Sequence, residues 1–148
     1  MVVNRLNNMV LVGLKNFDEF SKEIFKLDSN IQYFALIDLE GQVIVENSNT
    51  PVPFVEADAE RIMFYHQIGT RRSKREDFDD IYGKASYVHI QRKKIQQLIV
   101  YLHSVTIYLM IDNKSKPKEL IKIVHRLQKI EKEKLDKVLN SILVHENF

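Results

Sequence analysis

Residues 31–45 read IQYFALIDLEGQVIV, and this stretch decides the expected fold. Its first seven residues are apolar, aromatic and β-branched, as in a buried strand. Asp38 to Gly41 have the composition of a tight turn, with a glycine that is free to adopt positive φ. Val43 to Val45 predict the returning strand, and Asn47 to Pro51 predict a loop. The segment therefore predicts a β-hairpin.

Helical patterns flank this hairpin. Phe17 to Leu27 carry apolar residues at helical spacing, and the helix should end near residues 28–30. A second helix is expected from about 54 to 69, where Gly69-Thr70 weakens the pattern. The residues that favour this helix are Val55, Ala59, Ile62, Met63, Tyr65 and Ile68. Ser73 with Glu76 then resembles a capping box, which predicts a separate short helix through Ile81 that Gly83 stops.

The second half of the chain predicts more strands and a long helix. Lys84 to Gln91 alternates in part, and Arg92-Lys93-Lys94 predicts a polar turn. Ile95 to His103 and Val105 to Ile111 are strongly apolar, and they form either a hairpin around His103-Ser104 or one long bent strand. Pro117 suits the first turn of a helix. The residues expected to pack this helix are Leu120, Val124, Leu127 and Ile130.

This order of elements predicts an α/β (α+β) fold, in which helices sandwich a roughly five-stranded antiparallel sheet. With 148 residues, 45% of them apolar, the chain is expected to form a single domain over residues 1–148. Residues 1–14 either extend the first helix or fray, and residues 131–148 are expected to be a helical extension. No stretch has the pattern of a signal peptide or a membrane span, so we expect a cytoplasmic protein.

No motif in the sequence names a reaction. The chain has no cysteine, and its four glycines are scattered singly, unlike those of phosphate-binding loops. Its five histidines have no recognised metal spacing, and the carboxylates of Asp38, Glu40, Asp77, Asp79 and Asp80 fall in turns or helix starts. We therefore expect no enzymatic activity, no cofactor and no metal.

Charge is distributed unevenly along the chain. Residues 1–60 hold 4 Lys or Arg against 10 Asp or Glu, whereas residues 61–148 hold 18 against 10. The candidate contacts for an anion or a nucleic acid are Arg71, Arg72, Lys74, Arg75, Arg92, Lys93 and Lys94, with Tyr65, Tyr82 and Tyr87 as candidates for base stacking. The acidic residues that follow Arg75 would partly cancel the first of these basic clusters.

An apolar patch near the C-terminus is the candidate partner or dimer surface. It consists of Leu135, Val138, Leu139 and Ile142. The helical pattern that begins at Pro117 is longer than one side of a small sheet requires. This patch therefore either projects as an interaction surface or is buried where the chain bends back.

Two stretches carry a resemblance to a known family. The first runs from Phe17 to Val45, and the second includes TRRSKREDF (70–78), YGKASYV (82–88) and RKK (92–94). In this order they resemble a family of small proteins without an assigned activity that is common in ammonia-oxidising archaea. That family is in turn similar to the roadblock/dynein-light-chain and profilin-like group. The sequence departs from its pattern at Glu46-Asn47, where small glycines are typical.

The resemblance implies a five-stranded antiparallel sheet between helices, a dimer and a protein partner, such as a small GTPase or its regulator. We therefore interpret the chain as a non-catalytic interaction or regulatory scaffold module. Its first alternative is a nucleic-acid-binding accessory protein that uses the basic clusters. A small-ligand sensor of the PAS type is the second alternative, and it requires a cavity that Phe34, Tyr101 and Tyr108 do not fill.

Overall fold

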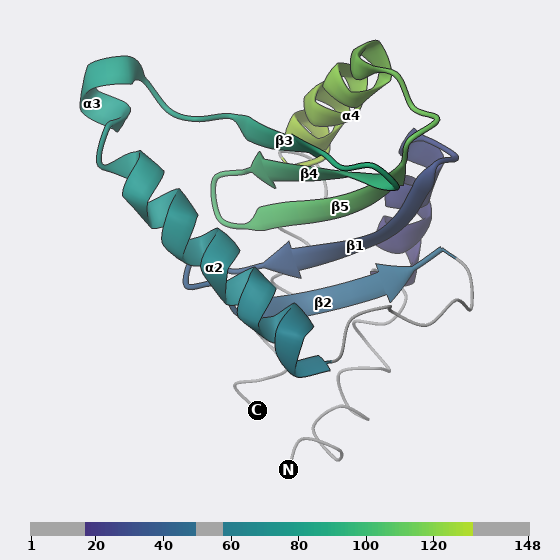
Figure 1. Ribbon diagram of the computed structural model, residues 1–148, viewed down its shortest axis with the longest axis horizontal. Helices are drawn as coiled ribbons and strands as arrows, with labels where there is room; N and C mark the ends of the chain where they lie inside the picture. The colour runs from purple at the N-terminus through teal and green to yellow at the C-terminus, as the bar shows by residue number, and fades with distance from the viewer. Residues whose placement is uncertain (1–16, 50–57, 132–148) are drawn as a thin grey trace.

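A computed structural model describes residues 17–49 and 58–131, which fold around one antiparallel sheet (Figure 1). The strand order in this sheet is β2-β1-β5-β4-β3. The strands are β1 (Ile31–Ile37), β2 (Val43–Ser48), β3 (Tyr87–Gln91), β4 (Ile95–Tyr101) and β5 (Thr106–Asp112). Within these residues β2 and β3 form the two edges, and β5 lies at the centre.

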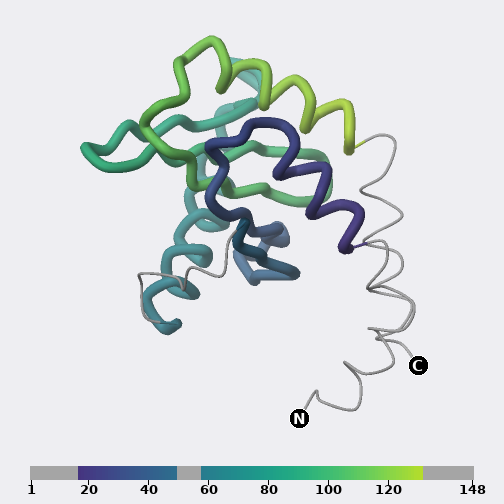
Figure 2. Tube along the Cα trace, turned by 90° about the vertical axis from the view of Figure 1, so that its right-hand side faces the viewer, coloured from purple at the N-terminus to yellow at the C-terminus, as the bar shows by residue number. Residues whose placement is uncertain are grey.

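Helices cover both faces of the sheet. They are the helix over residues 17–27, α2 (Asp58–Glu76), α3 (Asp79–Tyr82) and α4 (Pro117–Ile130). The helix over residues 17–27 and α4 lie side by side on one face, and α2 crosses the other (Figures 1 and 2). The short α3 continues from the end of α2 beyond the edge of the sheet (Figure 1).

The larger core lies beneath the helix over residues 17–27 and α4. Phe20 and Ile24 from the first helix pack with Phe34 of β1, and the Phe20 and Phe34 rings meet edge to face at 5.9 Å. The apolar positions of α4 complete this core, with Leu120, Ile123, Val124 and Leu127 all buried. The periodicity of both helices therefore predicted the correct buried faces.

The smaller core lies beneath α2. Tyr65 and Ile68 of α2 pack against Ile37 of β1 and Tyr108 of β5. Phe34 and Tyr108 are both fully buried, on opposite faces of the sheet. Both rings fill core space between the sheet and its helices, and the PAS-type alternative stays a prediction.

Several expected boundaries are confirmed. β1 has its predicted bounds, α4 begins at Pro117, and Gly83 follows α3 with a positive φ of 83°. His103 and Ser104 form a hairpin turn, closed by a 3.0 Å hydrogen bond from the Leu102 N–H to the Val105 carbonyl. The alternative of one long bent strand is therefore wrong.

Two predictions in the middle of the chain are wrong. β2 continues to Ser48, into the predicted loop, and α2 is one helix that runs through Gly69 to Glu76. The predicted capping residue Ser73 lies inside this helix. The buried residues of α2 are Arg61, Tyr65, Ile68 and Gly69, whereas Ile62 and Met63 are 55% and 60% exposed.

Gly69 is a packing position and not a helix breaker. A Cβ atom added there would lie 2.6 Å from the Cα of Gly41, because α2 crosses directly over the β1–β2 turn. Gly41 itself has a φ of 87°, which residues with a side chain rarely adopt. Two glycines from distant parts of the chain thus allow helix and turn to touch.

Some sequence-based expectations fall on residues that the structure leaves undescribed. They are the frayed or helical segment 1–14, the expected helix start at 54–57 and the helical extension over residues 132–148, which contains Leu135, Val138, Leu139 and Ile142. In the part of the chain that is described, no helix is long and apolar enough to cross a membrane.

Candidate interaction surface

The outer side of β3 is open within the described residues, where β3 pairs only with β4. The Ser86 carbonyl and the Arg92 N–H both bond to β4, at 3.0 and 2.9 Å. Backbone groups of alternate residues point to opposite sides of an antiparallel strand. The N–H and C=O groups of Tyr87, His89 and Gln91 therefore point away from the sheet.

β3 lacks the features that normally protect an edge strand. Such edges commonly carry Lys, Pro or a bulge that blocks pairing with another chain. The five residues YVHIQ contain none of these, and β3 pairs with β4 without a register shift. The opposite edge strand, β2, has a register irregularity against β1 and carries Glu46. Of the two edges, β3 is the one suited to pairing.

A small pocket of about 20 Å³ lies between α2 and β3 on the α2 face of the sheet, and we name it the α2–β3 pocket. It is lined by Phe64, Gln67, Ile68, Arg71, Arg75, Val88, Ile90, Ile99 and Tyr101. Val88 and Ile90 are only partly buried, because α2 packs mainly over β1, β5 and β4. The lining is thus mostly apolar, with two arginines on the α2 side and no acidic residue.

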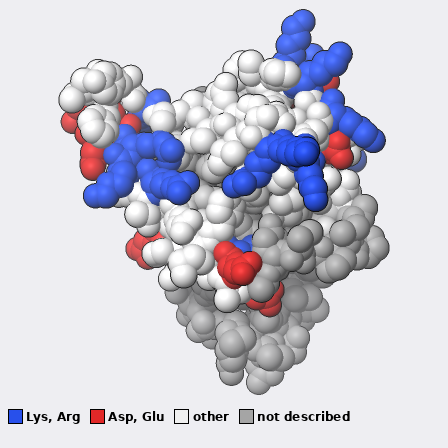
Figure 3. All heavy atoms as spheres, in the orientation of Figure 1, with Lys and Arg blue, Asp and Glu red and all other residues white. Residues whose placement is uncertain are grey.

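The two predicted basic clusters lie on the same face of the molecule. In Figure 3 one group of Lys and Arg side chains covers the C-terminal half of α2, and another lies at the β3–β4 turn. The surface between them is largely uncharged (Figure 3). Arg71 and Arg75 of the first cluster line the α2–β3 pocket. The fold therefore brings together cations that are 17 or more residues apart in sequence.

Arg72 differs from its neighbours in the first cluster. Its guanidinium donates to the carbonyls of Leu102 and Val105 and to the Thr106 Oγ1, and it pairs with Glu76 at 3.2 Å. These contacts fasten α2 to the β4–β5 hairpin. Arg72 is thus a structural residue, whereas Arg71, Lys74 and Arg75 are exposed.

The second cluster is held in place by its neighbours. The Asn113 side chain donates to the carbonyls of Arg92 and Lys93, and the Arg92 Nε donates to the Gln97 Oε1 at 2.6 Å. Gln97 also donates to the buried Tyr108 hydroxyl. The Arg92 side chain therefore lies along the α2 face, and these hydrogen bonds hold the turn in place.

A polar cluster that no local sequence pattern indicates fixes α2 on β2. Glu46 accepts hydrogen bonds from the Arg61 Nε and Nη2, both at 3.1 Å, and from the Tyr65 hydroxyl at 2.9 Å. Asp58 adds a second carboxylate 3.0 Å from Arg61. The hydrogen bond to Glu46 raises the pKa of the Arg61 guanidinium, and burial, followed by the Glu46 charge, raises the pKa of Tyr65.

Glu46 and Asn47 each connect β2 to a helix. Glu46 binds α2, and the Asn47 amide donates to the Ser21 hydroxyl at 3.2 Å, which links β2 to the helix over residues 17–27. Tyr65 is 1% exposed, so its predicted role in base stacking is wrong. Tyr82 and Tyr87 remain exposed.

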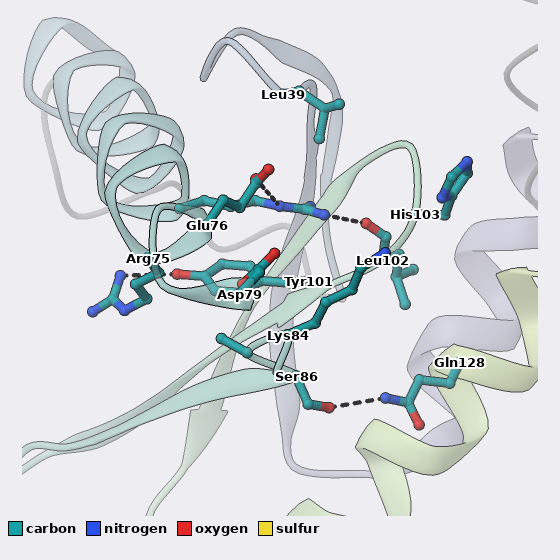
Figure 4. Close-up of a pocket in the computed structure, with 12 residues that line it drawn as sticks. Leu39, Arg75, Glu76, Asp79, Lys84, Ser86, Tyr101, Leu102, His103 and Gln128 are labelled. Carbon is teal, nitrogen blue, oxygen red and sulfur yellow. Dashed lines mark hydrogen bonds and ion pairs between the residues drawn. The ribbon is translucent and has the colours of Figure 1, made fainter. Parts of the chain in front are cut away.

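A polar cleft of about 500 Å³ lies at one end of the sheet (Figure 4). It is lined by Leu39, Arg72, Arg75, Glu76, Asp79, Lys84, Ala85, Ser86, Tyr101, Leu102, His103 and Gln128. Several of the lining side chains already bond to each other, since Arg72 pairs with Glu76 and the Gln128 amide donates to the Ser86 hydroxyl at 2.9 Å. In the described part of the chain, no three His, Asp or Glu side chains gather as metal ligands.

Comparisons with known proteins address the fold. No family model matches the sequence, and no curated protein matches it. Among solved structures, the gliding protein MglB of Thermus thermophilus matches with a TM-score of 0.65 at 12% identity, over 85% of this chain and 90% of that one. An MglB structure with a tetrameric arrangement gives 0.59 at 14% identity, over 79% and 88%. A roadblock/LC7 domain from Streptomyces avermitilis gives 0.54 at 8% identity, over 78% and 97%.

The fold is that of the roadblock/LC7 proteins. The identities are too low to carry more than the fold, so the predicted fold class and the roadblock resemblance are confirmed at that level. The assignment to an archaeal family stays a prediction. The nucleic-acid role of the basic clusters and the partner role of the C-terminal patch also stay predictions.

Proposed function

We propose that the protein is a non-catalytic interaction module that assembles with a second copy of itself through β3. One observation carries this proposal: among the residues that the structure describes, β3 is an uncharged edge strand with an open side, next to a partly exposed apolar surface. The likeness to MglB supports it, since one of the matched structures has a tetrameric arrangement. Members of the roadblock group typically act by binding other proteins.

The geometry of β3 restricts how two copies can pair. A two-fold axis perpendicular to the sheet places α2 of both copies on the same side of the joined sheet. Residues that face α2 must then pair with each other. An axis through His89 sets Val88 opposite Ile90 of the second copy, and Tyr87 opposite Gln91 of the second copy. This register uses the backbone groups of every outward-pointing residue of β3 and joins apolar side chains across the interface.

Sedimentation velocity tests this arrangement with two matched variants. Ile90→Lys places a charge in the joined apolar strip, and Val43→Lys places the same charge on the other edge strand. We expect the wild type and Val43→Lys to sediment at twice the 17.5 kDa chain mass, and Ile90→Lys to sediment as a monomer. A monomeric wild type, or an Ile90→Lys variant that stays dimeric with an intact circular dichroism spectrum, would overturn the proposal.

The C-terminal patch provides a separate proposal. Deleting residues 131–148 should weaken self-association more than folding if Leu135, Val138, Leu139 and Ile142 form a second contact. The same sedimentation experiment measures this. If the truncated protein remains fully dimeric, the C-terminal patch does not contribute to self-association, and this second proposal is wrong.

A further inference from the structure

We propose that α3 and the turn before it contact the β3–β4 turn of a second copy of this chain. This inference rests on the proposed pairing through β3 and deepens it, because it names a second contact that the paired strands bring about. Two such contacts form in one dimer, since each copy provides one α3 and one β3–β4 turn.

The proposed register places these two parts next to each other. An antiparallel pair of β3 strands sets the start of one strand beside the end of the other. With Tyr87 opposite Gln91 of the second copy, the segment before β3 meets the turn that follows β3 of the second copy. Residues 83–86 alone separate α3 from β3, and they span at most about 13 Å. In Figure 1 α3 lies beyond the β3 edge of the sheet, on the side from which β3 begins.

The surface of α3 is aromatic and acidic. Phe78 and Tyr82 are 54% and 81% exposed, and their rings stack on each other at 6.1 Å. Ile81 is 71% exposed. Asp77 and Asp80 are exposed as well, and neither forms an ion pair with another described residue. An exposed apolar patch with polar groups around it marks an interaction site, and these carboxylates favour a basic partner surface.

The β3–β4 turn provides that basic surface. Arg92, Lys93 and Lys94 follow one another along the turn, and all three are exposed (Figure 3). Neither lysine forms an ion pair within the described residues. Lysine stems pack on aromatic rings while their ammonium groups stay free to meet carboxylates. The turn is therefore complementary to α3 in both charge and shape of contact.

The cation closest to this contact is directed elsewhere. Lys84 is the only Lys or Arg between Asp77 and Tyr87. It lines the polar cleft together with Asp79, whereas Asp77 and Asp80 are not part of that lining (Figure 4). The charge that α3 presents outside the cleft is therefore negative.

Charge reversal tests this contact by sedimentation velocity over a dilution series. The α3 variant is Asp77→Lys/Asp80→Lys, and the turn variant is Lys93→Glu/Lys94→Glu. Each should weaken the dimer about tenfold or more, because like charges then face each other. An equimolar mixture of the two variants should form a heterodimer with nearly the wild-type dissociation constant, since each α3 then faces a turn of opposite charge. A contact within one chain would not give this recovery in the mixture.

A matched control separates the contact from effects of net charge. Adding Lys118→Glu/Lys122→Glu to the α3 variant restores the wild-type net charge, but these residues lie on α4, which covers the other face of the sheet. This protein should remain as weak a dimer as the α3 variant, whereas the α3 and turn variants combined in one chain should recover the wild-type affinity. Equal recovery by both fourfold variants would overturn the inference.

The outcomes also separate this inference from the proposed function. If Ile90→Lys is monomeric while the α3 and turn variants dimerise like the wild type, pairing through β3 stands and the contact of α3 is wrong. A monomeric wild type would overturn both. Circular dichroism spectra of the variants should match that of the wild type, because all the substituted side chains are exposed.

Discussion

Glu46→Ala should destabilise the protein by about 2–3 kcal/mol. Breaking a buried ion pair by removing one partner typically costs about 3–5 kcal/mol, because the other charge stays buried. The Arg61 side chain is only 9% exposed, and it would lose both hydrogen bonds to Glu46. The cost falls below that range because the Glu46 side chain is 24% exposed and Asp58 still contacts Arg61.

Urea unfolding at pH 7, followed by circular dichroism, measures this loss. Asp18→Ala is the matched control, because its ion pair with Lys22 joins two side chains that are 58% and 66% exposed. Removing such a surface pair should cost less than about 1 kcal/mol. The double variant Glu46→Ala/Arg61→Met should be more stable than Glu46→Ala alone, because the buried Arg61 charge that lost its partner is then removed as well. Equal losses for Glu46→Ala and Asp18→Ala would refute the reasoning.

Three further predictions follow from individual contacts. Gly69→Ala should destabilise the protein by about 1–3 kcal/mol in urea unfolding, because the new Cβ would lie 2.6 Å from the Gly41 backbone. This loss is expected although alanine favours helices more than glycine does. An unchanged or raised urea midpoint would contradict this contact. Arg72→Lys should lower the thermal midpoint, since a lysine cannot make all the bonds to the β4–β5 hairpin, whereas Arg71→Lys should not. Because the pKa of Tyr65 is raised in the folded protein, its stabilising contribution is complete below pH 10.0, the ordinary pKa, and is lost as the pH rises further. The free energy of unfolding of Tyr65→Phe should therefore fall less steeply above pH 10.0 than that of the wild type. Parallel curves of unfolding free energy against pH for the two proteins would exclude this role.

Local patterns in the sequence predicted much of the fold. The hairpin formed by β1 and β2, the turn at Arg92-Lys93-Lys94 and the start of α4 at Pro117 all depend on neighbouring residues. The length of α2 could not be found in this way. Gly69 breaks a helix in isolation, but here its lack of a side chain allows contact with Gly41, a residue 28 positions earlier.

The roles of the charged residues depended on contacts distant in sequence. Glu46 and Arg61 come from separate elements, and nothing local pairs them. One signal was present, because Arg61, Tyr65, Ile68 and Arg72 recur at helical spacing and so share one face of α2. That spacing would have separated Arg72 from the exposed Arg71 and would have placed Tyr65 in the core.

Hydrogen exchange of the β3 amides tests self-association through this edge most directly. The amides of Val88 and Ile90 bond to β4, so they should be protected in every folded variant and report that β3 is intact. The amides of Tyr87, His89 and Gln91 should be protected in the wild type and should lose this protection in Ile90→Lys. Free exchange at these three outward amides in the wild type, with Val88 still protected, would contradict pairing through β3.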